Sequence, residues 1–94
     1  PVHTLPDRPK NELARLKVDK ASKLFKKYSY HSAIRIARQS LADEPSYNAY
    51  RIICLSSCAL RDLANSKAAY DKLPAAQKRT MRAKCADMGF ELYQ

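Results

Sequence analysis

The sequence has little of what a β-sheet protein needs. It contains a single glycine, no tryptophan and only eight β-branched residues among 94. A sheet of this size would require more valine, isoleucine and threonine, and glycine for its turns. Alanine and leucine lead the apolar residues instead, with fourteen and ten copies, and both enter helices at little free-energy cost. The composition therefore predicts an all-α domain.

Long hydrophobic runs are also lacking. No apolar stretch follows a charged start, so we expect neither a signal peptide nor a transmembrane segment. The first residue is proline rather than methionine, and the chain therefore looks like a domain cut from a larger protein.

Cysteine is scarce, and its number is odd. The three cysteines are Cys54, Cys58 and Cys85, and the first two lie one turn apart on an expected helix. This set does not resemble a disulfide framework, so we expect small buried thiols between helices and a reducing, cytoplasmic setting. Zinc would need a fourth ligand and tighter cysteine spacing, and neither His3 nor His31 is placed to complete a site. We therefore expect no metal site.

Catalytic motifs are missing as well. The sequence has no glycine-rich phosphate loop, no acid and base spaced to converge on one face, and no nucleophile motif beside a histidine. A chain of 94 residues with one glycine also has little room to build a cleft. We expect no enzyme activity and no cofactor.

The apolar residues that are present recur at helical spacing. We predict five helices, over residues 11–28, 29–43, 47–61, 65–73 and 75–88. In the first helix, the arc expected to face the core holds Leu13, Ala14, Val18, Ala21, Leu24, Phe25 and Tyr28. Because the links are short, neighbouring helices should pack as antiparallel hairpins.

Prolines and one glycine mark the ends of these elements. Residues 1–10 contain three prolines and are predicted to be an extended linker, which leaves residues 11–94 as a single domain. Pro45 should stop the second helix, and Ser46 should cap the third. Gly89 suits the left-handed position that follows a helix end.

A faint internal repeat connects the two halves of the chain. At an offset of 33 residues, Ala21 pairs with Cys54 and Ala33 pairs with Ser66. Small residues therefore recur at the two places where helices would have to approach closely.

With Tyr30 at the first turn and Pro45 after the second helix, the pattern resembles the tetratricopeptide repeat, whose units are helix–turn–helix hairpins of 34 residues. The resemblance covers residues 12–73 as two units and implies that residues 75–88 form a capping helix. Two units are fewer than such arrays usually contain, so further helices, the rest of a longer chain or self-association would complete the stack. The end of the chain is also similar to short helical-repeat tails on large bacterial multidomain proteins.

The resemblance implies a protein-interaction module, because in that family the first helix of each unit lines a concave face that receives a peptide. The positions carried over to this chain as partner-binding residues are Arg15, Ser22, Phe25, Lys26, Asn48, Arg51 and Leu55. Cations beside apolar residues suit a segment with acidic and hydrophobic side chains. The alternative is that Arg15 and Lys26 are solvated surface charges.

Basic residues give the chain a net charge of +9, and they are concentrated at one end. Residues 1–38 carry ten Lys or Arg against three acidic residues. Nucleic acid is therefore the alternative partner, because the lysines of the first helix could meet phosphates and its nearby tyrosines could stack on bases. Against this, Tyr28 belongs to the expected core arc, and no known nucleic-acid-reading motif is present. We expect no membrane binding, because the apolar face of that helix is needed in the core.

Overall fold

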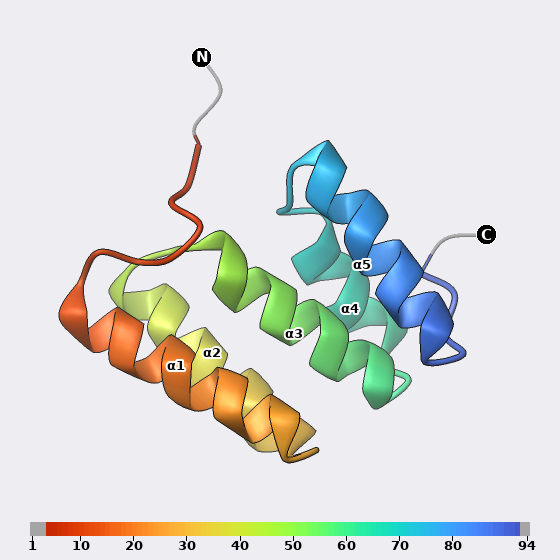
Figure 1. Cartoon of the computed structure of the whole chain (residues 1–94), viewed down its shortest axis with the longest axis horizontal. Helices are drawn as coiled ribbons and strands as arrows, with labels where there is room; N and C mark the ends of the chain where they lie inside the picture. Colours follow the sequence, from red (N-terminus) through yellow and green to blue (C-terminus); the bar gives the residue numbers. More distant parts are fainter. Residues whose placement is uncertain (1–3, 93–94) are drawn as a thin grey trace.

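The computed structural model describes residues 4–92 of the chain, which form five α-helices and no strand. The helices are α1 (Glu12–Lys26), α2 (Tyr30–Asp43), α3 (Tyr47–Ala59), α4 (Leu63–Tyr70) and α5 (Ala75–Asp87). The predicted all-α class is confirmed, and the helix contacts are compatible with antiparallel hairpins. Helices α1 and α2 lie side by side, and α3 lies between them and the α4–α5 pair (Figure 1).

Small residues allow α1 and α2 to pack closely. Ala14 and Ala21 on α1 and Ala33 and Ala37 on α2 have no exposed surface. The hydroxyl of Ser40 on α2 donates a hydrogen bond of 2.8 Å to the carbonyl oxygen of Ala14. This bond satisfies a polar side chain that the close packing would otherwise leave unpaired.

The predicted core arc of α1 was wrong at its two ends. The Tyr28 side chain is 77% exposed and Leu13 is 60% exposed. Helix α1 ends at Lys26, and Tyr28 then adopts the left-handed conformation with a φ of 64°. The amide of Ser29 donates back to the carbonyl of Leu24, which closes the helix in the way that glycine usually does. The turn therefore rotates Tyr28 away from the apolar face.

Helix α3 is the centre of the molecule, because it contacts each of the other four helices. Ile53, Cys54 and Cys58 are among its buried residues. Ser46 occupies the predicted N-cap position, but its hydroxyl donates to the Asn48 side chain instead of capping the backbone.

Residues 4–10 form neither helix nor strand, and they lie against the start of α3 (Figure 1). The carbonyl oxygens of Pro6 and Asp7 accept the amide hydrogens of Tyr47 and Asn48, which have no partner within the helix. Pro9 is fully buried. This segment is therefore part of the packed structure, although the sequence pattern describes it as a linker.

Helix α4 begins earlier than the predicted 65–73, because Asp62 caps it by accepting the backbone N–H of Asn65 at 3.1 Å. It also ends earlier, at Tyr70. Pro74 is the N-cap of α5. Gly89 has a φ of 80°, which confirms the predicted left-handed position, and the amide of Phe90 donates to the carbonyl of Cys85.

The expectation that the cysteines form no disulfide was wrong. Cys58 and Cys85 are bridged across a sequence separation of 27 residues, and this bond ties α5 to α3. Only Cys54 is a buried free thiol. The bridge was not visible in the sequence because it depends on how α5 folds back onto α3. The inference of a reducing compartment, which rested on the absence of a disulfide, loses its basis.

Candidate functional site

A groove of about 410 Å³ is formed by residues 4–10 together with α1, α3 and α5. We call it the concave groove. Its lining residues are Arg8, Val18, Asp19, Ser22, Phe25, Lys26, Asn48, Arg51, Ile52, Leu55, Met81 and Lys84.

Six of the seven partner-binding residues predicted from the sequence lie together in this groove. Helix α1 contributes Ser22, Phe25 and Lys26, and α3 contributes Asn48, Arg51 and Leu55. The seventh, Arg15, is exposed on α1 outside the groove. Helical spacing places three of them on one face of α1 and three on one face of α3, and the packing of α1 against α3 brings the two sets together.

Sequence reasoning missed the parts of the groove supplied by other segments. Arg8 comes from the segment predicted to be a linker, and Met81 and Lys84 come from α5. The four-residue spacing of Met81 and Cys85, the two buried residues of α5, was the sequence signal for the inward face of this helix. No local pattern indicated that residues 4–10 would fold back onto α3.

Arg51 is the most heavily bonded cation of the groove. Its guanidinium donates to both carboxylate oxygens of Asp7, at 2.5 and 3.1 Å, and to the Gln77 side chain at 2.7 Å. The hydrogen bonds that Arg51 donates to Asp7 hold the pKa of Asp7 below its usual value. Arg51, which lines the groove, therefore already makes a bidentate interaction with one carboxylate, and that carboxylate belongs to the chain itself.

The other basic residues of the groove differ in their pairing. Arg8 is paired with Asp19 at 2.6 Å. Lys26 and Lys84 are exposed, and neither has an ion-pair partner within residues 4–92. They lie in the same groove as the half-buried apolar residues Phe25 and Leu55. An incoming acidic and apolar segment would thus find two unneutralised cations beside hydrophobic surface.

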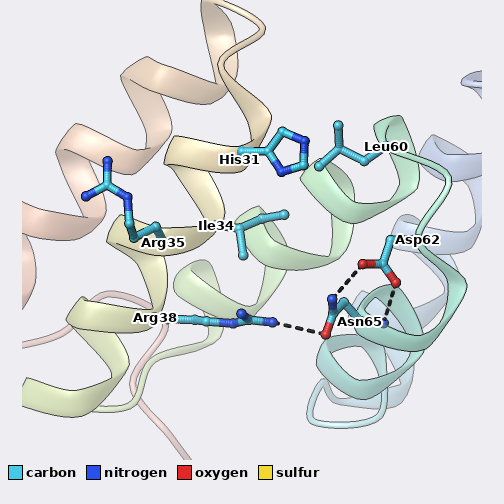
Figure 2. A pocket seen from close by; sticks show the side chains of 7 residues that line it. All are labelled: His31, Ile34, Arg35, Arg38, Leu60, Asp62 and Asn65. Carbon is cyan, nitrogen blue, oxygen red and sulfur yellow. Dashed lines mark hydrogen bonds between the residues drawn. The ribbon is translucent and has the colours of Figure 1, made fainter.

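A second hollow of about 500 Å³ lies between α2 and the α3–α4 turn, and its lining includes His31, Arg38 and Asp62 (Figure 2). Three of its polar side chains, Arg38, Asn65 and Asp62, are joined by hydrogen bonds, whereas His31 and Arg35 have no such partner among residues 4–92. Arg38 donates to the Asn65 side chain at 3.0 Å, and Asn65 in turn donates to Asp62 from both its backbone and its side chain. The hydrogen bond from the Asn65 backbone has the largest effect in lowering the pKa of Asp62, and the bond from the Asn65 side chain adds to it. Within the described part of the chain, Arg35 is therefore the unpaired cation of this hollow, whereas the concave groove has two, Lys26 and Lys84.

The three cysteines form a third cluster, inside the molecule. The Ser66 hydroxyl of α4 lies 2.9 Å from the Cys58 sulfur and 3.8 Å from the Cys54 sulfur, and it donates to the Cys54 carbonyl at 3.1 Å. Burial raises the pKa of the Cys54 thiol. The groups of this cluster belong to three different helices, α3, α4 and α5.

These features define the class of protein, which is a small all-helical domain with a groove between its helices. Comparison of the chain with protein-family models, curated proteins and solved structures finds no match. Within residues 4–92, every helix is too short or too polar to cross a bilayer.

Proposed function

We propose that this chain is a non-enzymatic protein-interaction module that binds an acidic or amphipathic segment of another protein in the concave groove. In a larger polypeptide or complex it would serve as an adaptor. The observation that carries the proposal is the pair of unneutralised cations, Lys26 and Lys84, in a groove that also contains Phe25 and Leu55. The tetratricopeptide identity is a separate hypothesis, with which the hairpin arrangement is compatible.

The chain itself supports the expected ligand chemistry. The Asp7 carboxylate, from the non-helical segment of residues 4–10, is held by Arg51, which lines the groove. Extended backbone leaves alternate side chains free to enter pockets, and a carboxylate fits the fork of an arginine. We infer that a partner segment presents acidic groups to Lys26 and Lys84 while its apolar side chains meet Phe25 and Leu55.

Peptide titrations test this proposal. The probe is a fluorescent peptide that alternates glutamate and leucine, and the reference is the same peptide with glutamine in place of glutamate. Lys26→Glu and Lys84→Glu should each weaken binding of the acidic peptide by roughly tenfold, the ratio that corresponds to a loss of about 1.4 kcal/mol. Binding of the glutamine peptide should be weak and little changed by either substitution.

Lys20→Glu is the matched control, because it makes the same charge change on α1 at an exposed residue outside the groove. It should leave the affinity for the acidic peptide unchanged. Equal weakening by Lys20→Glu would mean that overall charge, not the groove, attracts the peptide. Circular dichroism of each variant should show the same helix content as the unmodified chain.

A basic surface for nucleic acid is the second candidate function, and one observation favours it. Tyr28 is exposed beside Lys27 in the turn that follows α1, and Lys20 and Lys23 are exposed on α1 itself. The sequence pattern places Tyr28 in the core, which argues against base stacking, but its side chain is exposed. An exposed aromatic ring near lysines suits single-stranded nucleic acid.

The same variants separate the two functions. If nucleic acid is the partner, labelled single-stranded oligonucleotides will bind at near-physiological salt, and Lys20→Glu and Tyr28→Ala will weaken them. If the groove function is right, oligonucleotides bind weakly at that salt, and only the groove substitutions affect the acidic peptide.

A further inference from the structure

Three sulfur atoms converge inside the molecule, independently of the concave groove. Cys54 and Cys58 lie one turn apart on α3, and Cys85 projects from α5. The three sulfurs all lie within 4.8 Å of one another, and none of the three residues has exposed surface.

This spacing is close to that of ligands around one ion. Thiolates bind a metal ion at about 2.3 Å, so three sulfurs around a common ion lie roughly 4 Å apart. Only the Cys58–Cys85 bond stands in the way, because it engages two of the three donors. Breaking that bond frees both side chains to rotate about Cα–Cβ, and only small movements are then needed.

We propose that, once the Cys58–Cys85 bridge is reduced, Cys54, Cys58 and Cys85 form a buried three-sulfur binding site for Cu(I). The expectation of no metal site rested on the missing fourth zinc ligand, on the cysteine spacing and on the two histidines, with Cys85 taken to lie away from the pair on α3. The fold adds Cys85, which the sequence could not place beside that pair.

The donor set selects Cu(I) over Zn(II). Structural zinc sites are four-coordinate, and the fourth polar side chain in this cluster is the Ser66 hydroxyl, which already donates to the Cys54 carbonyl. Thiolates are soft ligands, and soft ligands suit Cu(I). Three sulfurs without a further donor therefore match a three-coordinate soft cation.

The chemistry balances in two steps. A trialkylphosphine in the test tube, or a dithiol in a cell, supplies two electrons to the disulfide, and two protons complete the thiols of Cys58 and Cys85. The phosphine becomes its oxide with oxygen from water, or the dithiol becomes a disulfide. Binding of Cu(I) then displaces protons from the thiols it ligates, with no change in the oxidation state of copper.

Entry to the site is through α5. Of its 13 residues only Met81 and Cys85 are buried, so without the bridge this helix is held by few contacts. An outward movement of α5 would expose the three sulfurs together.

The test uses the whole chain, reduced with a phosphine and titrated with Cu(I) under anaerobic conditions against a chromogenic Cu(I) chelator. We expect one Cu(I) per chain to be retained, and X-ray absorption should show three sulfur neighbours. The oxidised chain should retain none at the same chelator concentration. Circular dichroism follows the helix content during the titration. If reduction lowers the helix content and Cu(I) restores it, that result supports the site equally.

Cys54→Ser and Cys54→Ala keep the disulfide pair and remove the third ligand. Both should weaken Cu(I) retention by the reduced chain at least tenfold, while the oxidised forms keep the helix content of the unmodified protein. The proposal is overturned if the reduced chain retains no Cu(I), if copper has only two sulfur neighbours, or if the Cys54 variants bind as tightly. Retention of Zn(II) but not Cu(I) against chelators of matched strength would overturn it as well.

Discussion

Two adjacent serines on α3 are buried without a hydrogen-bond partner for their hydroxyl groups among residues 4–92. These are Ser56 and Ser57, and both have no exposed surface. A third buried serine, Ser40, does have a partner, because its hydroxyl donates to the Ala14 carbonyl. An unpaired buried hydroxyl lowers stability, whereas a paired one adds a modest net gain. The same residue type thus has opposite energetic consequences at the two places.

Alanine substitutions will reveal this difference. We expect Ser57→Ala to raise the free energy of unfolding by about 1 kcal/mol, since it removes an unsatisfied group and alanine is the better helix former. Ser40→Ala should lower it by about 1 kcal/mol through loss of the bond to Ala14. Urea denaturation followed by circular dichroism measures both. Destabilisation of similar size in the two variants would mean that the Ser57 hydroxyl has a partner in solution.

At the scale of elements, α5 depends on a covalent bond more than the other helices do. Among residues 4–92, the side chains with almost no exposed surface are small, and the largest of them is Val18, while larger core residues such as Tyr70 and Leu73 are 4 to 5% exposed. A domain of this size can bury only a limited core, and small domains often compensate with a disulfide. The Cys58–Cys85 bridge closes the chain between α3 and α5, so it stabilises the helix that has the fewest buried residues of its own.

Reduction of this bridge should lower the free energy of unfolding by about 3 to 4 kcal/mol, as expected from loop entropy at a separation of 27 residues. Urea titrations with and without a phosphine reductant, in metal-free buffer, provide the measurement. Cys54→Ser keeps the bridge and should show the same response to the reductant. A double variant, Cys58→Ala with Cys85→Ala, should show none. If the reductant still lowers the stability of the double variant, the loss of stability does not come from the Cys58–Cys85 bridge.

At the scale of the whole molecule, charge and shape act together. The chain carries 18 basic and nine acidic residues on a body that measures 36 by 36 by 17 Å. Most side chains of so thin a body lie near solvent, and like charges repel across short distances. The three described ion pairs are at the surface and contribute little each. Repulsion should therefore dominate the electrostatic part of stability.

Added salt should accordingly stabilise the protein. Raising sodium chloride from about 20 to about 200 mM shortens the Debye screening length about threefold. That is enough to weaken the repulsion between charges about 10 Å apart. We expect a gain of about 0.5 kcal/mol, or roughly 2 to 4 °C in Tm. Lys20→Glu reduces the net charge by two and should show a smaller salt response. A fall in Tm with salt would show that the ion pairs outweigh the repulsion.

The helices could be predicted because their signals are local. Apolar residues at helical spacing indicated α1, α2, α3 and α5, and Pro45, Pro74 and Gly89 marked ends that the structure confirms. Two of the errors, at the ends of α1 and α3, lie where the terminating residue is unusual. Tyr28 and Arg61 adopt left-handed conformations that favour glycine, so residue type gave no warning of either turn.

Part of the candidate site was also predictable. Ser22, Phe25 and Lys26 share a face of α1 through helical spacing alone, and their partners on α3 follow the same rule. The contact between Asp7 and Arg51 joins residues 44 positions apart, and no pattern near either one indicates it. Lys84 reaches the groove only because α5 folds back onto α3.

By itself, the sequence determined the helical class, the approximate helices and the basic character of the N-terminal part, because propensity, periodicity and charge are properties of nearby residues. Only the tertiary structure decided that α3 lies at the centre, that Cys85 bonds to Cys58 while Cys54 stays free, and that residues 4–10 lie on the start of α3. These outcomes depend on which surfaces meet across long separations. Packing of small side chains settles that choice, and local sequence does not encode it.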